Sequence, residues 1–479
     1  MPTSQTDPGY DIAVVGAGPA GLAAATSAAN SGARVALIDS GARVGGQYWR
    51  HRRGDDIRHQ HRWKEFRRLR GNLDHLRALI DYLPEHFVWH VERTGSGFST
   101  HATCGDAERV VDSRAVVVAT GAYDRQLPFP GWTLPGVFTA GAVQGLLKGQ
   151  GVLAGRRVGV AGTGPFLLAV AAGLAEAGAT VVGVFEAGLP TGFARHPLAV
   201  LANPGKVAEG AGYLRILARH RVPCHPRTGV IAAHASPSGD SVHGVTVARL
   251  DRDWRPVPGT DRRIDCDTVA VGYGFVPQIE IPLQLGCDTR LDVDDSLVAV
   301  VDDRQRSTVP GVFIAGEACG VGGAVLSVLE GELAGLHAAH LTGAGVPDPA
   351  RVRRLARRRA AQRSFATAMH QAFPVAAGWS SWLDDDTVIC RCEEVPASAV
   401  TRAVDQLGAT DPRAVKLFAR PGMGLCQGRM CGFATAGLVA DRLGRTVTAE
   451  DLRGMSSRPI AQPITLGTLA AGPRGGRVS

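Results

Sequence analysis

The chain has 479 residues, 45% of them hydrophobic and 20% charged, which fits a globular protein of about two to four domains. No apolar run approaches the roughly 20 residues that span a bilayer, and the N-terminus lacks a signal-peptide pattern, so we expect a cytoplasmic protein with no membrane span. The formal net charge of +8 comes largely from arginines in residues 50–70 and 351–359, but neither stretch forms a recognisable nucleic-acid module, so we expect solvent-exposed or partner-facing helix surfaces and no bound nucleic acid.

The first predicted element is a strand–helix–strand unit over residues 11–39. An apolar run at each end predicts a buried parallel strand, and an alanine-rich stretch between them predicts a helix. Gly16 permits a tight turn, Gly18 lets a pyrophosphate approach the backbone, and Gly21 lets helix and strand pack closely. Asp39 follows Gly16 by 23 residues, where a carboxylate can accept hydrogen bonds from a ribose diol. The unit therefore predicts a bound dinucleotide.

Residues 157–186 repeat this pattern. They contain a strand, Gly162-x-Gly164, an alanine-rich helix and a second strand ending on Glu186. Leu167 stands at the third glycine position, so helix and strand cannot pack as closely there. We predict the same fold for this unit and leave open whether it binds a nucleotide. If it does, Glu186 repels a 2′-phosphate and favours NAD or an adenosine ligand over NADP.

Two further strands end on small, glycine-rich turns. One covers residues 115–118 and leads into Ala119-Thr120-Gly121. The other covers residues 311–315 and leads into Gly316-Glu317 and a glycine-rich helix start near Ala324. A strand, an acidic turn and a helix N-terminus form a corner suited to an anion and a diol. The alternative is a purely structural crossover.

Four of the nine cysteines cluster in the last quarter of the chain, at Cys390, Cys392, Cys426 and Cys431. The other five are scattered singly, as buried cysteines of a cytosolic protein are. The CxC…CxxxxC arrangement supplies the four thiolates of a [2Fe–2S] cluster. Arg391, Lys416 and Arg429 are near in sequence and offset the charge of such a cluster. A zinc ion is the main alternative, although its sites favour CxxC pairs, and a site without metal is the third.

Together these motifs resemble the flavoproteins with two dinucleotide-binding domains, the glutathione-reductase-like class, in that family's order. The resemblance implies an α/β fold with two doubly wound, Rossmann-like nucleotide-binding domains and a small C-terminal helical [2Fe–2S] domain. The implied division is a split FAD domain (9–149 and 265–345), an inserted second nucleotide-binding domain (150–264), a linker with an arginine-rich helix (346–386), the [2Fe–2S] domain (387–453) and a tail (454–479).

The resemblance also implies roles for individual residues. Gly16, Gly18 and Gly21 hold the FAD pyrophosphate, Asp39 holds the adenosine ribose, and Glu317 meets the ribityl chain where the family commonly has aspartate. The other residues implied to line FAD are Pro19, Ala20, Ser40, Gly46, Gln47, Thr120, Gly121, Gly316 and Ala324. The second site, with NAD or ATP as its ligand, is assigned to Gly162, Gly164 and Glu186.

Two departures from the family concern the outlet for electrons. Disulfide reductases carry a redox-active CxxxxC after the paired glycines, where this chain has Gln47-Tyr48-Trp49. A CxxC in the second nucleotide domain is also absent, so dithiol chemistry is excluded as the outlet. The C-terminal segment is instead similar to bacterioferritin-associated ferredoxin, with CxxxxC in place of that protein's tighter second pair.

The full set of motifs resembles one narrower group, the larger flavoprotein subunits of opine oxidase, D-proline or hydroxyproline dehydrogenase and hydrogen cyanide synthase, and more distantly sarcosine oxidase alpha. This implies an electron-transfer subunit that takes electrons from a smaller FAD-containing, amine-oxidising subunit, with a further small iron–sulfur protein as an additional partner. We assign no catalytic residue for amine oxidation to this chain. The alternatives are a self-sufficient NAD(P)H-dependent reductase, and a regulatory or assembly subunit with ATP or ADP in the second site and a structural cluster.

Overall fold

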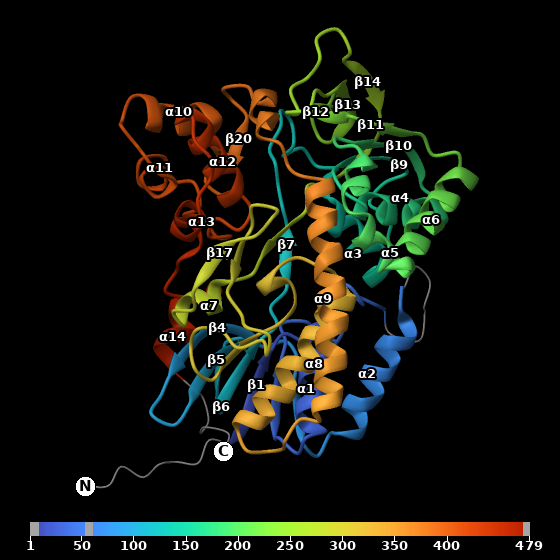
Figure 1. Ribbon diagram of the computed structural model, residues 1–479. Helices are drawn as coiled ribbons and strands as arrows, with labels where there is room; N and C mark the ends of the chain where they lie inside the picture. Colours follow the sequence, from blue (N-terminus) through green and yellow to red (C-terminus); the bar gives the residue numbers. More distant parts are fainter. Residues whose placement is uncertain (1–8, 53–60, 473–479) are drawn as a thin grey trace.

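The computed structural model describes residues 9–52 and 61–472; part of the first basic stretch, residues 53–60, lies outside this range. A seven-stranded sheet forms the lower part of the molecule in Figure 1, a five-stranded sheet forms the upper right, and C-terminal helices form the upper left. Across the described range, no helix combines the length and the hydrophobicity that a bilayer crossing requires.

The lower sheet is built from two segments of the chain that are far apart in sequence. Its strands in spatial order are β3 (Ile80–Leu83), β2 (Val35–Ile38), β1 (Tyr10–Val15), β6 (Ala107–Val118), β5 (Phe98–Cys104) and β4 (Phe87–Arg93), with β19 (Val312–Ile314) also paired to β6. The helices α1 (Pro19–Ala29) and α8 (Ala324–Leu341) pack against each other beside it. The central strands run parallel and are almost entirely buried, which explains their continuous apolar sequences.

The upper sheet repeats the strand order of the lower one around its own βαβ unit. Its parallel strands are β11 (Cys224–Pro226), β10 (Thr180–Glu186), β9 (Arg157–Gly162), β15 (Thr268–Gly272) and β8 (Val137–Thr139). An antiparallel sheet lies beyond it, made of β12 (Thr228–Ala235), β13 (Val242–Arg249) and β14 (Arg262–Asp265). The chain crosses between the two units through β7 (Ala122–Asp124) and β16 (Phe275–Pro277), which pair antiparallel.

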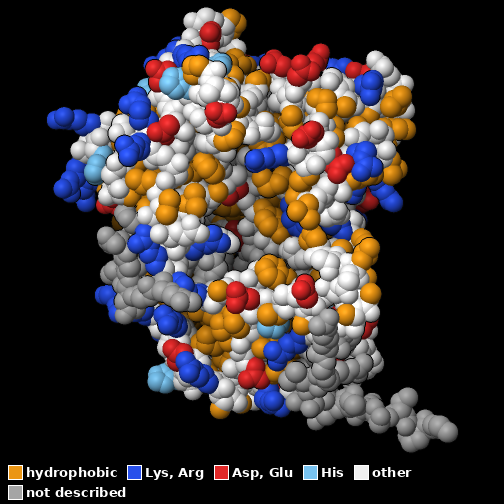
Figure 2. Space-filling view, turned by 180° about the vertical axis from the view of Figure 1, so that it is seen from behind, with side chains coloured by type: hydrophobic (Ala, Val, Ile, Leu, Met, Phe, Trp, Pro, Cys, Tyr) orange, Lys and Arg blue, Asp and Glu red, His pale blue; other side chains and the backbone are white. Residues whose placement is uncertain are grey.

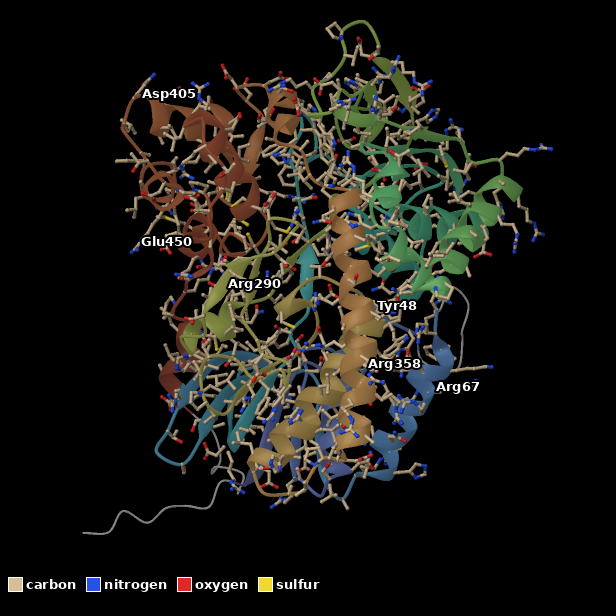
Figure 3. The ribbon with its side chains drawn as sticks, viewed as in Figure 1. Tyr48, Arg67, Arg290, Arg358, Asp405 and Glu450 are labelled. Atoms are coloured by element: carbon tan, nitrogen blue, oxygen red, sulfur yellow. The ribbon has the colours of Figure 1, made fainter. Side chains whose placement is uncertain are left out.

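The long helix α9 (Pro349–Ala372) carries the second basic stretch and rises from α8 toward the upper unit (Figure 1). Its exposed arginines are Arg353, Arg354, Arg357 and Arg358. Figure 3 shows Arg358 on α9 and Arg67 on the neighbouring basic helix α2 (Trp63–His75). Seen from behind, Lys and Arg side chains are interspersed with acidic and hydrophobic ones (Figure 2). These arginines of α2 and α9 therefore lie on exposed helix surfaces, as the sequence predicts.

The C-terminal unit is a small helical body packed onto the rest of the chain. It contains the short hairpin β20 (Val388–Cys390) and β21 (Val395–Pro396), and helices α10 (Ala397–Asp405), α11 (Pro412–Ala419), α12 (Gly432–Arg442) and α13 (Ala449–Ser456). The Trp132 Nε1–H donates to the carbonyl of Val388 at 2.6 Å, and the rings of Trp254 and Trp382 stack 6.0 Å apart. These tryptophans join the apolar core of the upper unit to that of the C-terminal unit. The C-terminal unit is therefore held in place by packing.

Asp451 fixes the start of α13 and gives a prediction for this unit. Its carboxylate accepts hydrogen bonds from Arg445 and from the Thr448 backbone. Burial by itself would raise the pKa of Asp451. The hydrogen bonds lower the pKa by more than burial raises it, so the pKa lies below its usual value. Asp451→Asn is expected to reduce the free energy of unfolding by about 2 kcal/mol at pH 7. A depressed carboxylate pKa stabilises the fold above about pH 4, and this contribution disappears as pH falls further.

Thermal unfolding of the full chain at pH 7 and at pH 3.5, followed by circular dichroism, measures this effect. Asp74→Asn is the matched control, because Asp74 at the end of α2 pairs with Arg77 in the following turn, and both are exposed, so that the pair contributes little. A deficit of Asp451→Asn that stayed the same at both pH values would contradict the electrostatic explanation.

Candidate functional site

The first nucleotide loop joins the end of β1 to the start of α1. A Cβ atom at Gly21 would lie 1.7 Å from the carbonyl oxygen of Gly16, and one at Gly16 would lie 2.3 Å from that of Ala119. Close packing therefore requires glycine at both positions. Gly18 is different, because a Cβ there would meet nothing nearer than Gly46, at 3.9 Å. The space beside Gly18 lies at the N-terminus of α1, where Pro19 and Ala20 form the first turn and a phosphate can be bound.

Asp39 stands at the end of β2 and holds this loop. Its carboxylate accepts hydrogen bonds from the backbone N–H groups of Ala17 at 2.5 Å and of Gly41 at 2.6 Å. Burial raises the pKa of Asp39, and the two hydrogen bonds oppose that effect. Ser40 next to it is exposed. The acid thus has a structural role in the loop in addition to the sugar contact predicted from the motif.

The other residues predicted to line FAD gather at the same edge of the lower sheet. A Cβ at Gly46 would lie 2.8 Å from the Cα of Gly18, and Gln47 beside it is exposed. The Thr120 hydroxyl donates to the carbonyl of Gln278 at 2.7 Å, and Gln278 returns a backbone hydrogen bond to Gly121. These loops follow β2 and β6, which pair in parallel with the two sides of β1, so the structure brings the predicted residues together.

Glu317 lies in the turn between β19 and α8. Its carboxylate accepts hydrogen bonds from the N–H groups of Gly323 at 2.9 Å and Gly322 at 3.3 Å, just before Ala324 starts α8. Burial raises the pKa of Glu317 against these bonds. The side chain that the resemblance assigns to the ribityl chain therefore also caps the N-terminus of α8.

A buried ion pair supports this turn and was not predicted from the sequence. Glu330 of α8 accepts a hydrogen bond from the backbone of Gly316 at 3.1 Å and pairs with Arg363 of α9 at 2.5 Å. Glu330 is 2% exposed, and Asp292 also lies beside Arg363. An acid inside the apolar sequence of α8 was the available signal, but its partner comes from a different helix.

The second nucleotide loop copies the first one in outline. Glu186 at the end of β10 accepts hydrogen bonds from the backbone of Gly164 and Gly188, both at 2.8 Å. Burial raises the pKa of Glu186. A Cβ at Gly188 would lie 3.6 Å from the ring of Phe373, at the end of α9. The corner beyond Glu186 is therefore partly covered by the chain itself, and Gly162 ends β9 at the same edge.

The four clustered cysteines form two pairs. The thiol of Cys431 lies beside that of Cys390, and this contact lowers the pKa of the Cys390 thiol to about 5 and raises that of Cys431. Cys392 and Cys426 are likewise within hydrogen-bonding reach of each other. Throughout residues 9–52 and 61–472, no group of three or more His, Cys, Asp or Glu side chains converges as around a single bound ion.

The surrounding backbone fits closely around these thiols. The Gly422 N–H donates to the sulfur of Cys390 at 3.4 Å. A Cβ at Gly424 would lie 2.3 Å from the Cβ of Cys392, so glycine is required for this approach. Backbone N–H donors directed at sulfur stabilise the thiolate form, which is the form that binds metal.

Side chains of β7 and of the residue after it pack against the segment around Cys426 and Cys431. The Arg429 guanidinium lies over the ring of Tyr123 at 5.7 Å, and Arg125 lies over the ring of Phe433 at 4.1 Å. Tyr123 lies on β7, which Arg125 follows directly, and β7 starts just after Gly121. The turn assigned to FAD and the loop assigned to the cluster are thus connected through β7.

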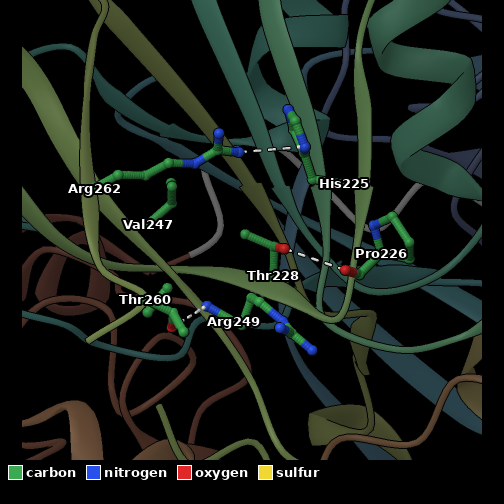
Figure 4. A pocket seen from close by; sticks show the side chains of 8 residues that line it. His225, Pro226, Thr228, Val247, Arg249, Thr260 and Arg262 are labelled. Carbon is green, nitrogen blue, oxygen red and sulfur yellow. Dashed lines mark hydrogen bonds between the residues drawn. The ribbon is translucent and has the colours of Figure 1, made fainter. Parts of the chain in front are cut away.

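A separate open pocket of about 370 Å³ lies on the antiparallel sheet of the upper unit (Figure 4). The Arg262 guanidinium donates to the ring of His225 at 3.3 Å at its edge, and Val247 and Ala248 form part of its wall. None of the residues predicted to bind a cofactor lines this pocket, so it does not enter the functional argument.

Comparison with known proteins identifies two families along the chain. Residues 10–343 match the model described as pyridine nucleotide-disulphide oxidoreductase, and residues 388–441 match the BFD-like [2Fe-2S] binding domain. The second match includes all four clustered cysteines.

Individual relatives extend over nearly the whole chain. Hydrogen cyanide synthase subunit HcnB of Pseudomonas protegens is 33% identical over 460 residues, covering 94% of this chain and 95% of that protein. An opine oxidase subunit of Rhizobium meliloti strain 1021 is 33% identical over 475 residues, covering 96% and 98%. Among solved structures, L-proline dehydrogenase from P. horikoshii superposes with a TM-score of 0.69 at 21% identity, covering 96% of this chain and 79% of that one, which establishes a shared fold.

Proposed function

Because the chain belongs to the pyridine nucleotide-disulphide oxidoreductase family and carries a BFD-like [2Fe-2S] domain, we propose that it is the electron-transfer subunit of a multimeric dehydrogenase for an amino acid or secondary amine. Opines, D-proline and sarcosine-like amines are the substrate class. The chain is a FAD-dependent oxidoreductase, and its relatives are named as subunits of hydrogen cyanide synthase and opine oxidase.

The connection through β7 is the observation that carries this proposal. Gly121, assigned to FAD, lies two residues before Tyr123, and Tyr123 contacts Arg429 in the cysteine loop. Arg429 in turn donates to the carbonyl of Cys426 at 3.1 Å. A protein that only stored two independent cofactors would not need their loops in contact, whereas electron transfer requires them to be close.

FAD supplies two-electron chemistry when bound, and a [2Fe–2S] cluster exchanges one electron at a time. In the proposal, Gly16, Gly18 and Gly21 hold the pyrophosphate, Asp39 the adenosine ribose and Glu317 the ribityl side. Cys390, Cys392, Cys426 and Cys431 hold the cluster. We further propose that residues 9–149 and 265–345 form the FAD domain around the insert 150–264, and that 387–453 form the cluster domain.

The amine is oxidised elsewhere in this proposal, on a smaller FAD-containing subunit, with a small iron–sulfur protein as a further partner. In that step the C–N bond of the amine loses two electrons and two protons to become an imine, and the electrons then reach this chain. The proposal is supported by the relatives, which are named subunits, and by the absence of any CxxC or CxxxxC dithiol near the FAD residues of the sequence.

Co-expression with the product of a neighbouring gene for a small flavoprotein tests this assignment. We expect the two chains to purify together and to reduce an artificial acceptor when an amine is added, while this chain alone does not oxidise the amine. Full amine oxidation by the isolated chain would overturn the proposal.

The second nucleotide unit is the basis of the alternative, a reductase that accepts hydride from NADH. Two observations weigh against it. The ring of Phe373 lies beside Gly188, at the corner beyond Glu186. Leu167 also occupies the position of the third glycine.

A further inference from the structure

Glu280 is a buried carboxylate that contacts the cysteine loop, the segment from Cys426 to Cys431. It starts the short helix α7 (Glu280–Gln284). Its Oε1 lies 2.8 Å from Nε of Arg429 and 3.1 Å from Nη1 of Arg458. The three side chains are 10%, 8% and 4% exposed, respectively. A buried ion pair of this kind is weak evidence for stability, because desolvation offsets most of the attraction, so another role must be considered.

The position of Glu280 connects both cofactor regions. Gln278, two residues before it, accepts the hydroxyl hydrogen bond of Thr120 at 2.7 Å, in the turn assigned to FAD. Arg429 lies between Cys426 and Cys431 in the sequence and donates to the carbonyl of Cys426 at 3.1 Å. Glu280 therefore places a negative charge beside Arg429 of the cysteine loop, on a segment anchored at the other site.

These charges are poorly screened by solvent. The cavity between the C-terminal unit and the crossing strands β7 and β16 has a volume of only about 30 Å³. Its lining includes Tyr123, Glu280, Arg429, Phe433 and Arg458. A space of this size holds ordered water but no bulk solvent. Electrostatic interactions at such a site are stronger than at the surface and respond little to salt.

We propose that Glu280, through its negative charge between Arg429 and Arg458, sets the reduction potential of the [2Fe–2S] cluster. This rests on the proposed electron-transfer function. Arg429 keeps its place without this carboxylate, because it also donates to the carbonyls of Cys426 and Ala461. Each reduction adds one electron to a centre that already carries four thiolates, so nearby negative charge disfavours the reduced form and positive charge favours it. One carboxylate shared by two guanidiniums leaves a net positive charge beside the loop. Removing the carboxylate charge should raise the reduction potential of the cluster, and removing a guanidinium charge should lower it.

Anaerobic redox titration of the full chain, with dithionite as the one-electron donor and the cluster followed by electron paramagnetic resonance, measures this effect. Glu280→Gln keeps the size of the side chain and removes its charge, and we expect the cluster to be reduced more easily. The expected change is about tenfold in the reduction equilibrium, which corresponds to a midpoint rise of about 59 mV. Arg458→Gln is expected to lower the midpoint, and the double variant to return toward the wild-type value.

The recovery in the double variant separates an electrostatic role from a structural one, because removing a second side chain can cancel the missing charge but does not restore lost packing. Glu332→Gln is the matched control: Glu332 also lies between two arginines, Arg68 at 3.7 Å and Arg351 at 3.5 Å, but on the helices of the lower unit. It should leave the midpoint unchanged.

An unchanged or lowered midpoint in Glu280→Gln with the cluster intact would overturn the inference. If that variant loses its iron, Arg458→Gln decides alone, and a midpoint that did not fall would overturn it equally. Failure of the proposed function looks different: NADH would then reduce the wild-type chain without a partner, or the wild-type chain would hold no cluster that dithionite reduces.

Discussion

A Cys390→Ser variant is expected to keep its FAD, lose its iron and acid-labile sulfide, and stop passing electrons while still assembling with its partner. Cys390 is fully buried, and the neighbouring Cys431 thiol and the N–H of Gly422 lower the pKa of its thiol to about 5. A serine oxygen does not offer the thiolate that an iron–sulfur cluster requires. Loss of an outer-shell partner alone costs about 10–100-fold in metal affinity or activity, so loss of a ligand should reduce amine-dependent electron flow by more than that.

Iron and sulfide assays, the flavin absorbance and gel filtration of the co-expressed complex measure the three properties separately. Cys104→Ser is the matched control, because Cys104 lies at the end of β5 and is exposed, in contrast to the burial expected from the sequence. If Cys390→Ser instead caused the complex to fall apart, the cluster would be structural and the regulatory or assembly alternative would be favoured.

A Gly18→Ala variant is expected to fold normally and to bind FAD about tenfold to a hundredfold more weakly. The protein itself leaves room for the added methyl, whose nearest neighbour would be 3.9 Å away. The methyl group would instead meet the pyrophosphate, and overpacking of this kind costs about 1–3 kcal/mol, with about 1.4 kcal/mol per factor of ten. Gly21→Ala should differ, because its Cβ would lie 1.7 Å from the Gly16 carbonyl and disturb the fold as well.

The FAD content of the purified variants and their circular dichroism spectra distinguish these outcomes. Gly71→Ala in α2 is the control, since a Cβ there meets nothing within 4 Å and alanine favours a helix. A Gly18→Ala protein with a full complement of FAD would mean that the pyrophosphate lies elsewhere.

The general architecture could be predicted because parallel strands ending on glycine turns bring their loops to one edge of a sheet. The predicted fold class and the two cofactors, FAD and a [2Fe–2S] cluster, are confirmed by the matching families and by the shared fold. Local spacing was sufficient here, since Gly16, Asp39 and Gly121 all follow strands of the same sheet. The individual ligand residues and the domain boundaries stay predictions.

The contacts between units could not be predicted, because they depend on how segments distant in sequence pack together. Glu280 and Arg429 are 149 residues apart in the numbering (429 − 280), and no periodicity relates them. Arg429 itself was noted as a charge near the cysteines, but its partner came only from the structure. Asp39 shows a similar gap: the motif indicates its contact with a sugar, whereas its hydrogen bonds to the loop backbone require coordinates.

The central claim is that electrons reach this chain from a partner protein, and an anaerobic absorption titration of the purified chain tests it most directly. After iron and acid-labile sulfide are assayed, NADH and then dithionite are added while the flavin and cluster bands are followed. We predict that NADH leaves both unchanged and that dithionite reduces both. Rapid, stoichiometric bleaching of the flavin by NADH would contradict this account and identify the chain as a self-sufficient reductase.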